Sequence, residues 1–174
     1  KQSLLYRMPG DEWQRFANLR LLFGYMYTHP GANLIFMGGE FGQSSEWNFQ
    51  KSLDWHLLQY DFHSGIQKLV KDLNKLYQDY PALYEKQFSP EGFQWIDYGD
   101  HQNSVLTYIR KGINPKENIY VACNFTPVPR EKYRMGISKT GQLKEIFNSD
   151  DTKYGGSGMK NGTLEIGKTA WHGY

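Results

Sequence analysis

The sequence predicts two fold classes in succession, an α/β unit followed by an antiparallel all-β domain. In the first half, a short apolar run at 33–37 with the length of a buried strand lies between two stretches with helical periodicity. From about Phe88 onward, apolar and polar residues alternate in short runs that are separated by turn residues. We place the domain boundary there, which gives an α/β domain at 1–87 and an all-β domain at 88–174.

Both predicted helices of the first half begin at a possible capping box. Asp11 with Gln14 begins the first helix, and Ser64 with Gln67 begins the second. Pro81 ends the second helix because proline disfavours helical backbone before it. The apolar residues at helical spacing are Trp13, Phe16, Leu19, Phe23 and Met26 in the first helix, and Ile66, Leu69, Val70, Leu73, Leu76 and Tyr77 in the second.

The predicted strand at 33–37 has no partner in the first half. A buried parallel strand needs a hydrogen-bonded neighbour on each side, and no other part of 1–85 has strand character. The first half therefore predicts the tail of a larger α/β domain. We expect the missing neighbours to leave an apolar patch and an open strand edge, through which the chain self-associates.

Alternating runs predict the strands of the second half. These strands are 104–110, 119–125 and 133–137, with weaker signals at 143–147 and 164–166. Gly112, Asn114 and Pro115 fall between the first two runs, as the connection of a β-hairpin would.

Composition argues against several classes of partner. The 20 basic and 18 acidic residues are interspersed and give a net charge of +2, so we expect no nucleic-acid partner. No apolar run approaches the roughly 20 residues that cross a bilayer, so we expect no membrane association. The single cysteine, Cys123, allows no internal disulfide, offers no metal-binding spacing and fits a reducing compartment such as the cytoplasm. Because the chain begins at Lys1 without a targeting signature, we expect its start to be a truncation and not the native N-terminus.

Polar and aromatic residues gather directly after the apolar run, where parallel α/β proteins bind their ligands. Carboxylates there invite acid–base chemistry, indole rings pack on sugars, and amides bond to hydroxyls. Each also has an ordinary structural alternative, such as tying a loop, capping a helix, filling an interface or forming a turn. The candidate rim residues are Glu40, Gln43, Trp47, Asn48, Asp54 and Trp55.

Five motifs, taken in order, are similar to the C-terminal part of bacterial glycogen branching enzymes, members of the α-amylase superfamily. They are KQSLLYRMPGDEWQRFANLR at 1–20, LIFMGGEFGQSSEWN at 34–48, SLDWHLL at 52–58, NFTPVPR at 124–130 and YGGSG at 154–158. The resemblance implies that residues 1–87 end a catalytic (β/α)8 TIM barrel whose last strand is 33–37. It also implies that 88–174 form an antiparallel β-sandwich domain, incomplete because nothing matches the family's closing strand.

The same resemblance implies an activity. The family cuts an α-1,4 link of a glucan such as glycogen or amylose and joins the freed segment to a 6-hydroxyl, by a retaining double displacement that needs no cofactor and no metal. Its nucleophilic Asp, its acid/base Glu and its third Asp all precede the part matched by this chain. No residue here is therefore predicted to be catalytic, and the chain alone is expected to be inactive. Glu40 and Asp54 match none of the three.

Three alternatives remain open. Another hydrolase of the superfamily, such as an α-amylase, a debranching enzyme or a trehalose-forming enzyme, would share the end of the barrel, although SLDWHLL and NFTPVPR together favour branching enzymes. A glucan-binding β domain would need an exposed aromatic strip, for which Trp95, Tyr98 and Tyr108 are candidates. A purely structural β domain would only brace the barrel.

Overall fold

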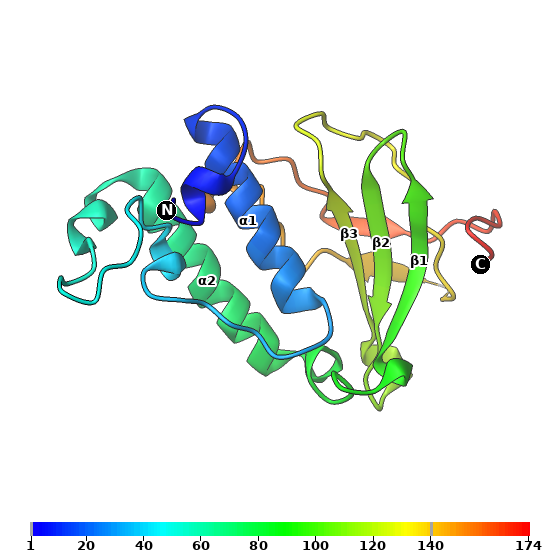
Figure 1. Cartoon of the computed structure of the whole chain (residues 1–174). Coiled ribbons are helices and arrows are strands. Elements are labelled where there is room, and N and C mark those ends of the chain that lie inside the picture. The colour runs from blue at the N-terminus through cyan, green and yellow to red at the C-terminus, as the bar shows by residue number, and fades with distance from the viewer. Residues whose placement is uncertain (1, 140) are drawn as a thin grey trace. The chain divides into compact units, whose positions relative to one another are not determined.

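The structure is a computed structural model that describes residues 2–139 and 141–174, and the chain folds into two compact units (Figure 1). The first unit comprises Lys1–Tyr27, Ala32–Asp79 and Asn148–Lys160, and the second comprises Thr28–Gly31, Tyr80–Phe147 and Asn161–Tyr174. The units therefore interleave along the sequence, whereas the predicted domains 1–87 and 88–174 are continuous.

Helix α1 (Glu12–Thr28) begins at the predicted capping box. The Gln14 backbone N–H donates to Asp11 Oδ1 at 2.8 Å, and the Asp11 N–H donates to Gln14 Oε1 at 3.0 Å. These two bonds satisfy donors that a helix N-terminus leaves open. Of the five predicted apolar residues the helix buries Phe16, Leu19 and Phe23, whereas Trp13 is 36% exposed.

Helix α2 (Asp61–Asp79) begins three residues before the predicted cap. Ser64 lies inside the first turn: its backbone N–H donates to the Tyr60 carbonyl at 3.0 Å and its hydroxyl to the Asp61 carbonyl at 3.2 Å. The predicted capping box at Ser64 is therefore wrong, because the helix already begins at Asp61, whose negative charge suits the positive end of the helix dipole. The helix ends two residues before Pro81, as predicted.

The two helices run in the same direction (Figure 1). Near their N-terminal ends the rings of Phe16 and Phe62 lie 5.1 Å apart. Toward their C-terminal ends the Tyr27 hydroxyl donates to Asn74 Oδ1 at 2.6 Å. Parallel neighbouring helices require a connection that returns along their length, and residues 32–36 begin that return as extended chain. The same order of helix, extended segment and helix is built into parallel α/β proteins.

The segment at 33–37 forms no strand within the described residues, so the predicted strand is absent. The physical reason is the missing neighbour, because no strand among the described residues of this unit lies beside 33–37 to complete a ladder. Leu34 is 78% exposed, Phe36 59% and Met37 46%. The expected apolar patch is therefore present on the first unit.

A segment from late in the chain completes the core of the first unit. It carries a short helical turn, η7 (Thr152–Tyr154), in which Tyr154 is buried. The Tyr154 hydroxyl donates to Asp72 Oδ2 at 2.5 Å, and Lys153 Nζ donates to the same oxygen at 2.8 Å. The Tyr154 carbonyl would lie 2.6 Å from a Cβ at Gly65, so this close approach requires glycine in α2. The YGGSG motif is thus part of the packing of the helical unit.

The second unit contains a three-stranded antiparallel sheet in the order β1 (Phe93–Asp100), β2 (Val105–Arg110) and β3 (Ile119–Asn124). Strands β2 and β3 confirm the predicted strands at 104–110 and 119–125 and are joined by the predicted turn residues. The sequence pattern does not single out β1 as a strand, because shifts of register between Trp95 and Asp97 and again before Asp100 break its alternation.

A second, two-stranded sheet pairs β4 (Gln142–Lys144) with β5 (Thr163–Glu165), which confirms the two weaker strand signals. The run at 133–137 forms no strand, so that prediction is wrong. Its polar groups bond to other partners. The Tyr133 hydroxyl donates to Asp100 Oδ2 at 2.9 Å, and the Gly136 N–H donates to His172 Nδ1 at 3.3 Å.

The core of the second unit contains polar groups with defined partners. Arg110 is buried and donates to the carbonyls of Thr28 and Leu83 at 2.9 and 2.8 Å. The hydroxyls of Tyr108 and Thr28 lie 2.6 Å apart. Burial raises the pKa of the Cys123 thiol to about 11, against the opposing effect of a hydrogen bond with Tyr108, so this thiol stays protonated at neutral pH.

Candidate functional site

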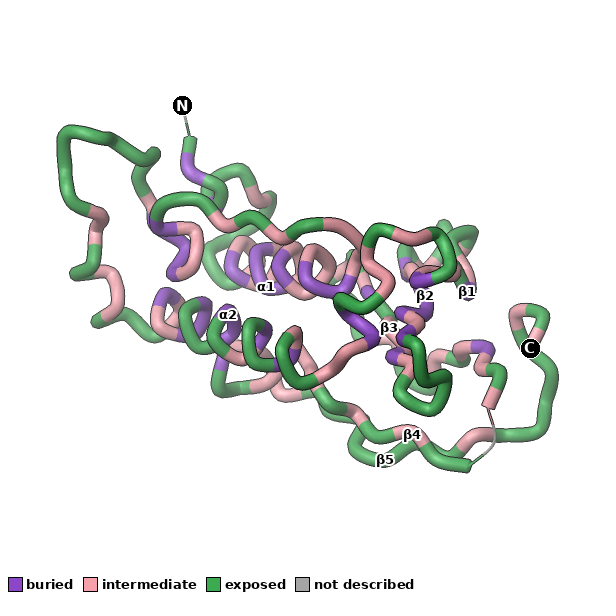
Figure 2. The backbone as a smooth tube through the Cα atoms, turned by 90° about the horizontal axis from the view of Figure 1, so that it is seen from below, coloured by how far each residue is buried: buried purple, intermediate pink, exposed green. Residues whose placement is uncertain are grey.

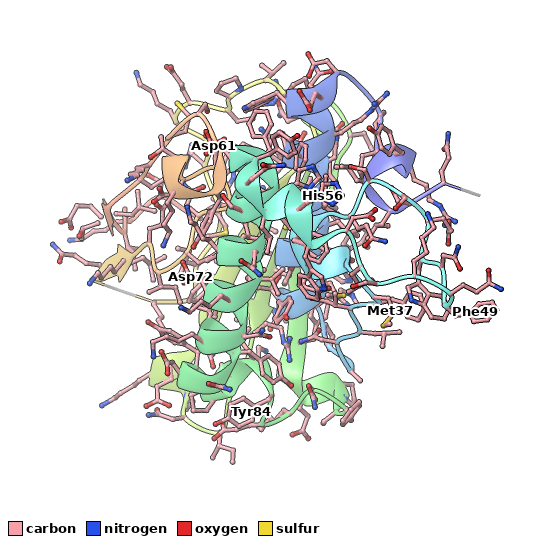
Figure 3. The ribbon with its side chains drawn as sticks, turned by 90° about the vertical axis from the view of Figure 1, so that its left-hand side faces the viewer. Met37, Phe49, His56, Asp61, Asp72 and Tyr84 are labelled. Atoms are coloured by element: carbon pink, nitrogen blue, oxygen red, sulfur yellow. The ribbon has the colours of Figure 1, made fainter. Side chains whose placement is uncertain are left out.

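The candidate rim residues lie on the loop of the first unit that leads from the extended segment at 32–36 to α2. Two short helical turns, η2 (Gly39–Phe41) and η3 (Trp55–Gln59), frame this loop. Every residue from 45 to 52 is exposed, and Figure 2 shows this stretch as a largely green arc beside the buried turns of α1 and α2. In Figure 3 the side chains of Met37 and Phe49 lie on the side of the loop away from α2.

A tight glycine turn opens the loop. Gly38 and Gly42 have φ values of 85° and 64°, in the left-handed region that glycine enters without steric cost. The Gly38 carbonyl accepts hydrogen bonds from the N–H groups of Phe41 and Gln43 at 3.3 and 2.9 Å. The turn also buries Phe41 completely.

His63 anchors this turn on α2. The ring of His63 is buried, and Nδ1 lies 2.9 Å from the Phe41 carbonyl oxygen, which accepts its hydrogen. Sequence reasoning missed this role. The only signal is the place of His63 in the first turn of the helix, beside the apolar face that begins with Ile66.

Gln43 and Asp54 hold the two ends of the loop together. Gln43 is only 7% exposed. Its Oε1 accepts the Asp54 backbone N–H at 2.9 Å, and its Nε2 donates to the Ser45 carbonyl at 3.3 Å. The Ser45 hydroxyl in turn donates to the Asp54 carboxylate. Both predicted rim residues thus bond to the loop itself.

Asn48 forms a turn at the tip of the loop. Its Oδ1 accepts the Gln50 N–H at 2.9 Å, and its carbonyl accepts the Lys51 N–H at 3.1 Å. Turn chemistry, the structural alternative for this residue, describes both contacts.

Glu40, Trp47 and Trp55 keep their polar groups open. Within residues 2–139 and 141–174, neither the Glu40 carboxylate nor either indole N–H makes a hydrogen bond or ion pair. Trp47 is 37% exposed and Trp55 50%, although each ring also rests on an aromatic neighbour. Trp47 meets Phe36 edge-on at 5.2 Å, and Trp55 lies tilted against Phe41 at 5.0 Å. These three side chains can offer a carboxylate, two donors and two partly open rings.

The structure divides the predicted aromatic strip of the second unit. Trp95 is 36% exposed and Tyr98 68%, and their rings lie 5.9 Å apart on β1. Tyr108 lies directly opposite Trp95 on the neighbouring strand, with the two rings 5.7 Å apart, but it is fully buried. The inclusion of Tyr108 in an exposed strip is therefore wrong, because the rings of Phe93 and Trp95 and the hydroxyl of Thr28 pack around it.

Among the described residues, no group of three or more His, Cys, Asp or Glu side chains is placed to hold a metal ion. In the same part of the chain, no helix has both the length and the apolar character of a membrane span.

Comparison with known proteins relates the whole chain to one kind of enzyme. The chain is 58% identical over 174 residues to the 1,4-alpha-glucan branching enzyme GlgB of Aquifex aeolicus. This match covers 99% of the chain and 28% of that protein. It is 52% identical over 173 residues to the enzyme of the same name from Rubrobacter xylanophilus, covering 99% of this chain and 24% of that protein. The chain thus spans about a quarter of the length of these curated relatives.

The second half also matches a domain family by itself. Residues 95–174 match the family described as the alpha amylase C-terminal all-beta domain, in agreement with the antiparallel sheets of the second unit. Over nearly its whole length the chain is therefore homologous to about a quarter of the length of 1,4-alpha-glucan branching enzymes, and its residues 95–174 match the C-terminal all-beta domain of the alpha-amylase family.

Proposed function

We propose that this chain is the C-terminal part of a 1,4-alpha-glucan branching enzyme. The observation that carries this proposal is the 58% identity that extends over 99% of the chain, across both units. The substrate of the whole protein would be an α-glucan such as glycogen or amylose. Its product would be a glucan with new α-1,6 branches, made in the cytoplasm.

The chemistry would be a retaining double displacement. One carboxylate attacks the anomeric carbon, a carboxylic acid protonates the leaving oxygen, and a sugar 6-hydroxyl replaces the enzyme in the second step. The two groups must lie about 5 to 5.5 Å apart. We assign neither role to a residue of this chain, and we expect the chain alone to be inactive.

The first unit would complete a (β/α)8 barrel in the longer protein, with 33–37 as its last strand. The parallel course of α1 and α2 supports this proposal, as does the extended, exposed segment that connects them. The second unit would form the β-sandwich domain that follows the barrel. Without the rest of the barrel, the exposed side chains of Leu34, Phe36 and Met37 would drive self-association.

The rim residues would then have two kinds of role. Glu40, Trp47 and Trp55 have open polar groups and partly open rings, so we propose that they contact the glucan. Gln43, Asn48 and Asp54 bond within the loop, so we propose that they shape it. An indole ring packs well against the C–H face of a sugar, while a carboxylate accepts hydrogen bonds from its hydroxyls.

A second glucan contact is favoured by the pair Trp95 and Tyr98 on β1. Their exposed rings, 5.9 Å apart and inclined at 62°, offer two aromatic surfaces on the all-β domain. This contact would hold a long glucan without taking part in the chemistry.

A chimeric enzyme tests the proposal. The segment of the Aquifex aeolicus enzyme that aligns with this chain is replaced by the chain, and branching of amylose is followed by loss of iodine staining. We expect the chimera to branch amylose and the 174-residue chain alone to leave it unchanged. A folded chimera without activity would contradict the assignment to branching enzymes. Activity in the chain alone would contradict the absence of catalytic carboxylates, and Glu40 and Asp54 would be the first residues to replace.

A further inference from the structure

We infer that Gln43 is a positioning residue: its side-chain amide ties the two ends of the rim loop 44–53 together and so fixes Trp47 and Trp55 where they meet the glucan. The inference deepens the proposed function and rests on it.

The argument begins with burial. Gln43 is 7% exposed, whereas every residue from 45 to 52 is exposed. An exposed loop without a core of its own has many conformations of similar free energy, and each ordered residue loses conformational entropy. One conformation is therefore favoured only if a buried group bonds to both ends of the loop. The side-chain amide of Gln43 is buried and makes such bonds.

Both ends of the amide are used. Oε1 accepts the N–H of Asp54, which lies eleven positions later, and Nε2 donates to the carbonyl of Ser45. The two bonds join the start of the loop to its end through one side chain. A buried amide that lost these partners would pay its full desolvation penalty, so the bonded conformation excludes the others.

The preceding turn is shaped around this side chain. Gly38 has a φ of +85°, and a Cβ there would lie 2.9 Å from both Cβ and Oε1 of Gln43. The carbonyl of Gly38 accepts the Gln43 N–H at 2.9 Å. The glycine thus lets backbone approach the amide on one side, while Asp54 approaches it on the other.

The two tryptophans follow the two points that the amide fixes. Trp55 comes directly after Asp54 and rests on the buried ring of Phe41. Trp47 comes two residues after Ser45 and meets Phe36. Loss of the amide would leave only the exposed hydrogen bond from the Ser45 hydroxyl to the Asp54 carboxylate between the two ends, so the two rings would move more freely. Because no residue of this chain is assigned to the bond that breaks, the loss should weaken glucan binding and leave the chemical step nearly intact.

The test uses Gln43→Leu in the active chimera, with Gln43→Glu as the conservative variant and Gln50→Leu as the matched control. Leucine nearly keeps the volume but makes neither bond. Glutamate keeps the acceptor for the Asp54 N–H and loses the donor to Ser45. Gln50 is exposed in the same loop, and its side chain makes no hydrogen bond among the described residues.

For Gln43→Leu we expect KM for amylose to rise about tenfold, the effect of losing roughly one hydrogen bond's net contribution, with kcat within about twofold of the unsubstituted value. Gln43→Glu should restore part of the loss, and Gln50→Leu should match the unsubstituted chimera. An unchanged KM for Gln43→Leu, or a fall in kcat as large as the rise in KM, would overturn the inference.

Hydrogen exchange on the 174-residue chain separates this inference from the proposed function. In the Gln43→Leu chain we expect the Asp54 amide to exchange at least about tenfold faster, because its hydrogen-bond acceptor is gone. The amides of α1 and α2 should be unchanged. Unaltered exchange at Asp54 would overturn the positioning role. If the unsubstituted chimera is inactive, the proposed function fails, and hydrogen exchange still decides whether Gln43 fixes the loop.

Discussion

Strand β2 and the segment at 33–37 have similar apolar content and opposite structural outcomes. In β2, Tyr108 has no exposed surface and hydrogen-bonded strands lie on both sides. At 33–37, Phe36 is 59% exposed and no ladder forms among the described residues. The difference teaches that an apolar run becomes a strand only where a neighbour completes it. The second unit holds strands on both sides of β2, whereas no strand of the described residues pairs with 33–37.

Paired aromatic truncations give the largest expected contrast. Tyr108→Ala should lower the free energy of unfolding of the second unit by about 3–5 kcal/mol, because it empties a fully buried site and removes the hydroxyl bond to Thr28. Phe36→Ala should change the stability of the first unit by less than about 0.5 kcal/mol, because the ring is largely exposed. Both changes in stability are measured by urea unfolding, with the hydrogen exchange of amides read separately in each unit.

The comparison breaks if the two substitutions have equal effects. A cost of several kcal/mol for Phe36→Ala would mean that 33–37 is packed within this chain. A small cost for Tyr108→Ala would mean that the sheet of the second unit does not depend on its central strand.

The elements that could be predicted from the sequence are those whose determinants lie close together in the chain. The capping box of Asp11 and Gln14 is complete within four residues, and β2 and β3 are joined by a short connection. The failures at 33–37 and 133–137 have another cause. The apolar run at 33–37 and the alternation at 133–137 are present, but the partners of the backbone are decided by distant parts of the fold.

A glycine in α2 tests the packed part of the first unit. Gly65→Ala places a methyl group 2.6 Å from the Tyr154 carbonyl, so the segment at 148–160 must move away. We expect a loss of about 1–3 kcal/mol in the stability of the first unit, typical of overpacking. Thermal or urea unfolding measures the change.

Gly167→Ala is the matched control, because nothing lies within 4 Å of a Cβ there. It should change stability by less than about 0.5 kcal/mol. Equal effects at the two glycines would show that residues 148–160 do not hold the first unit together.

Charging the apolar patch tests whether 33–37 lacks its neighbours. Leu34→Lys with Phe36→Lys should weaken self-association of the chain about tenfold or more, because two exposed apolar side chains become charged. Light scattering during size-exclusion chromatography over a range of concentrations measures the change. Phe88→Lys is the control, since Phe88 is 78% exposed but belongs to the second unit.

If the unsubstituted chain remains a monomer at high concentration and the amides of 33–37 resist exchange, the patch does not drive association. Other residues of this chain would then have to protect 33–37, and the contrast with β2 would be lost.

The connection from residue 37 to residue 60 shows which part of the candidate site could be predicted. The sequence places six candidates after an apolar run, and the structure puts all six in this connection between the extended segment and α2. It could not separate Gln43 from Glu40, because the burial of Gln43 depends on the left-handed turn at Gly38 and on an N–H eleven residues away. It also counted Tyr108 as exposed, because alternation along one strand does not reveal which neighbours cover its face.

The smallest expected effect concerns Asp72 on α2, whose carboxylate accepts the hydrogen bond of the Tyr154 hydroxyl. Burial alone would raise the pKa of Asp72, but hydrogen bonds from Lys153 and Tyr154 outweigh it and lower the pKa below its usual value. Since the folded pKa is lowered, the stabilisation is present above the unfolded pKa near 4 and is lost as pH falls through the lower folded value. Asp72→Asn should therefore flatten the fall in stability of the first unit below about pH 4.

At neutral pH the cost of Asp72→Asn should be only about 0.5 kcal/mol, because the carboxylate is 39% exposed and water screens the pair with Lys153. Urea titrations at several pH values measure both effects, with Asp79→Asn as the control for an exposed pair on the same helix. If Asp72→Asn leaves the acid limb of the profile unchanged, the segment at 148–160 is held by the packing of Tyr154 against Gly65 and not by charge. The packed segment 148–160 and the exposed segment 33–37 would then differ only in the apolar contacts that each makes.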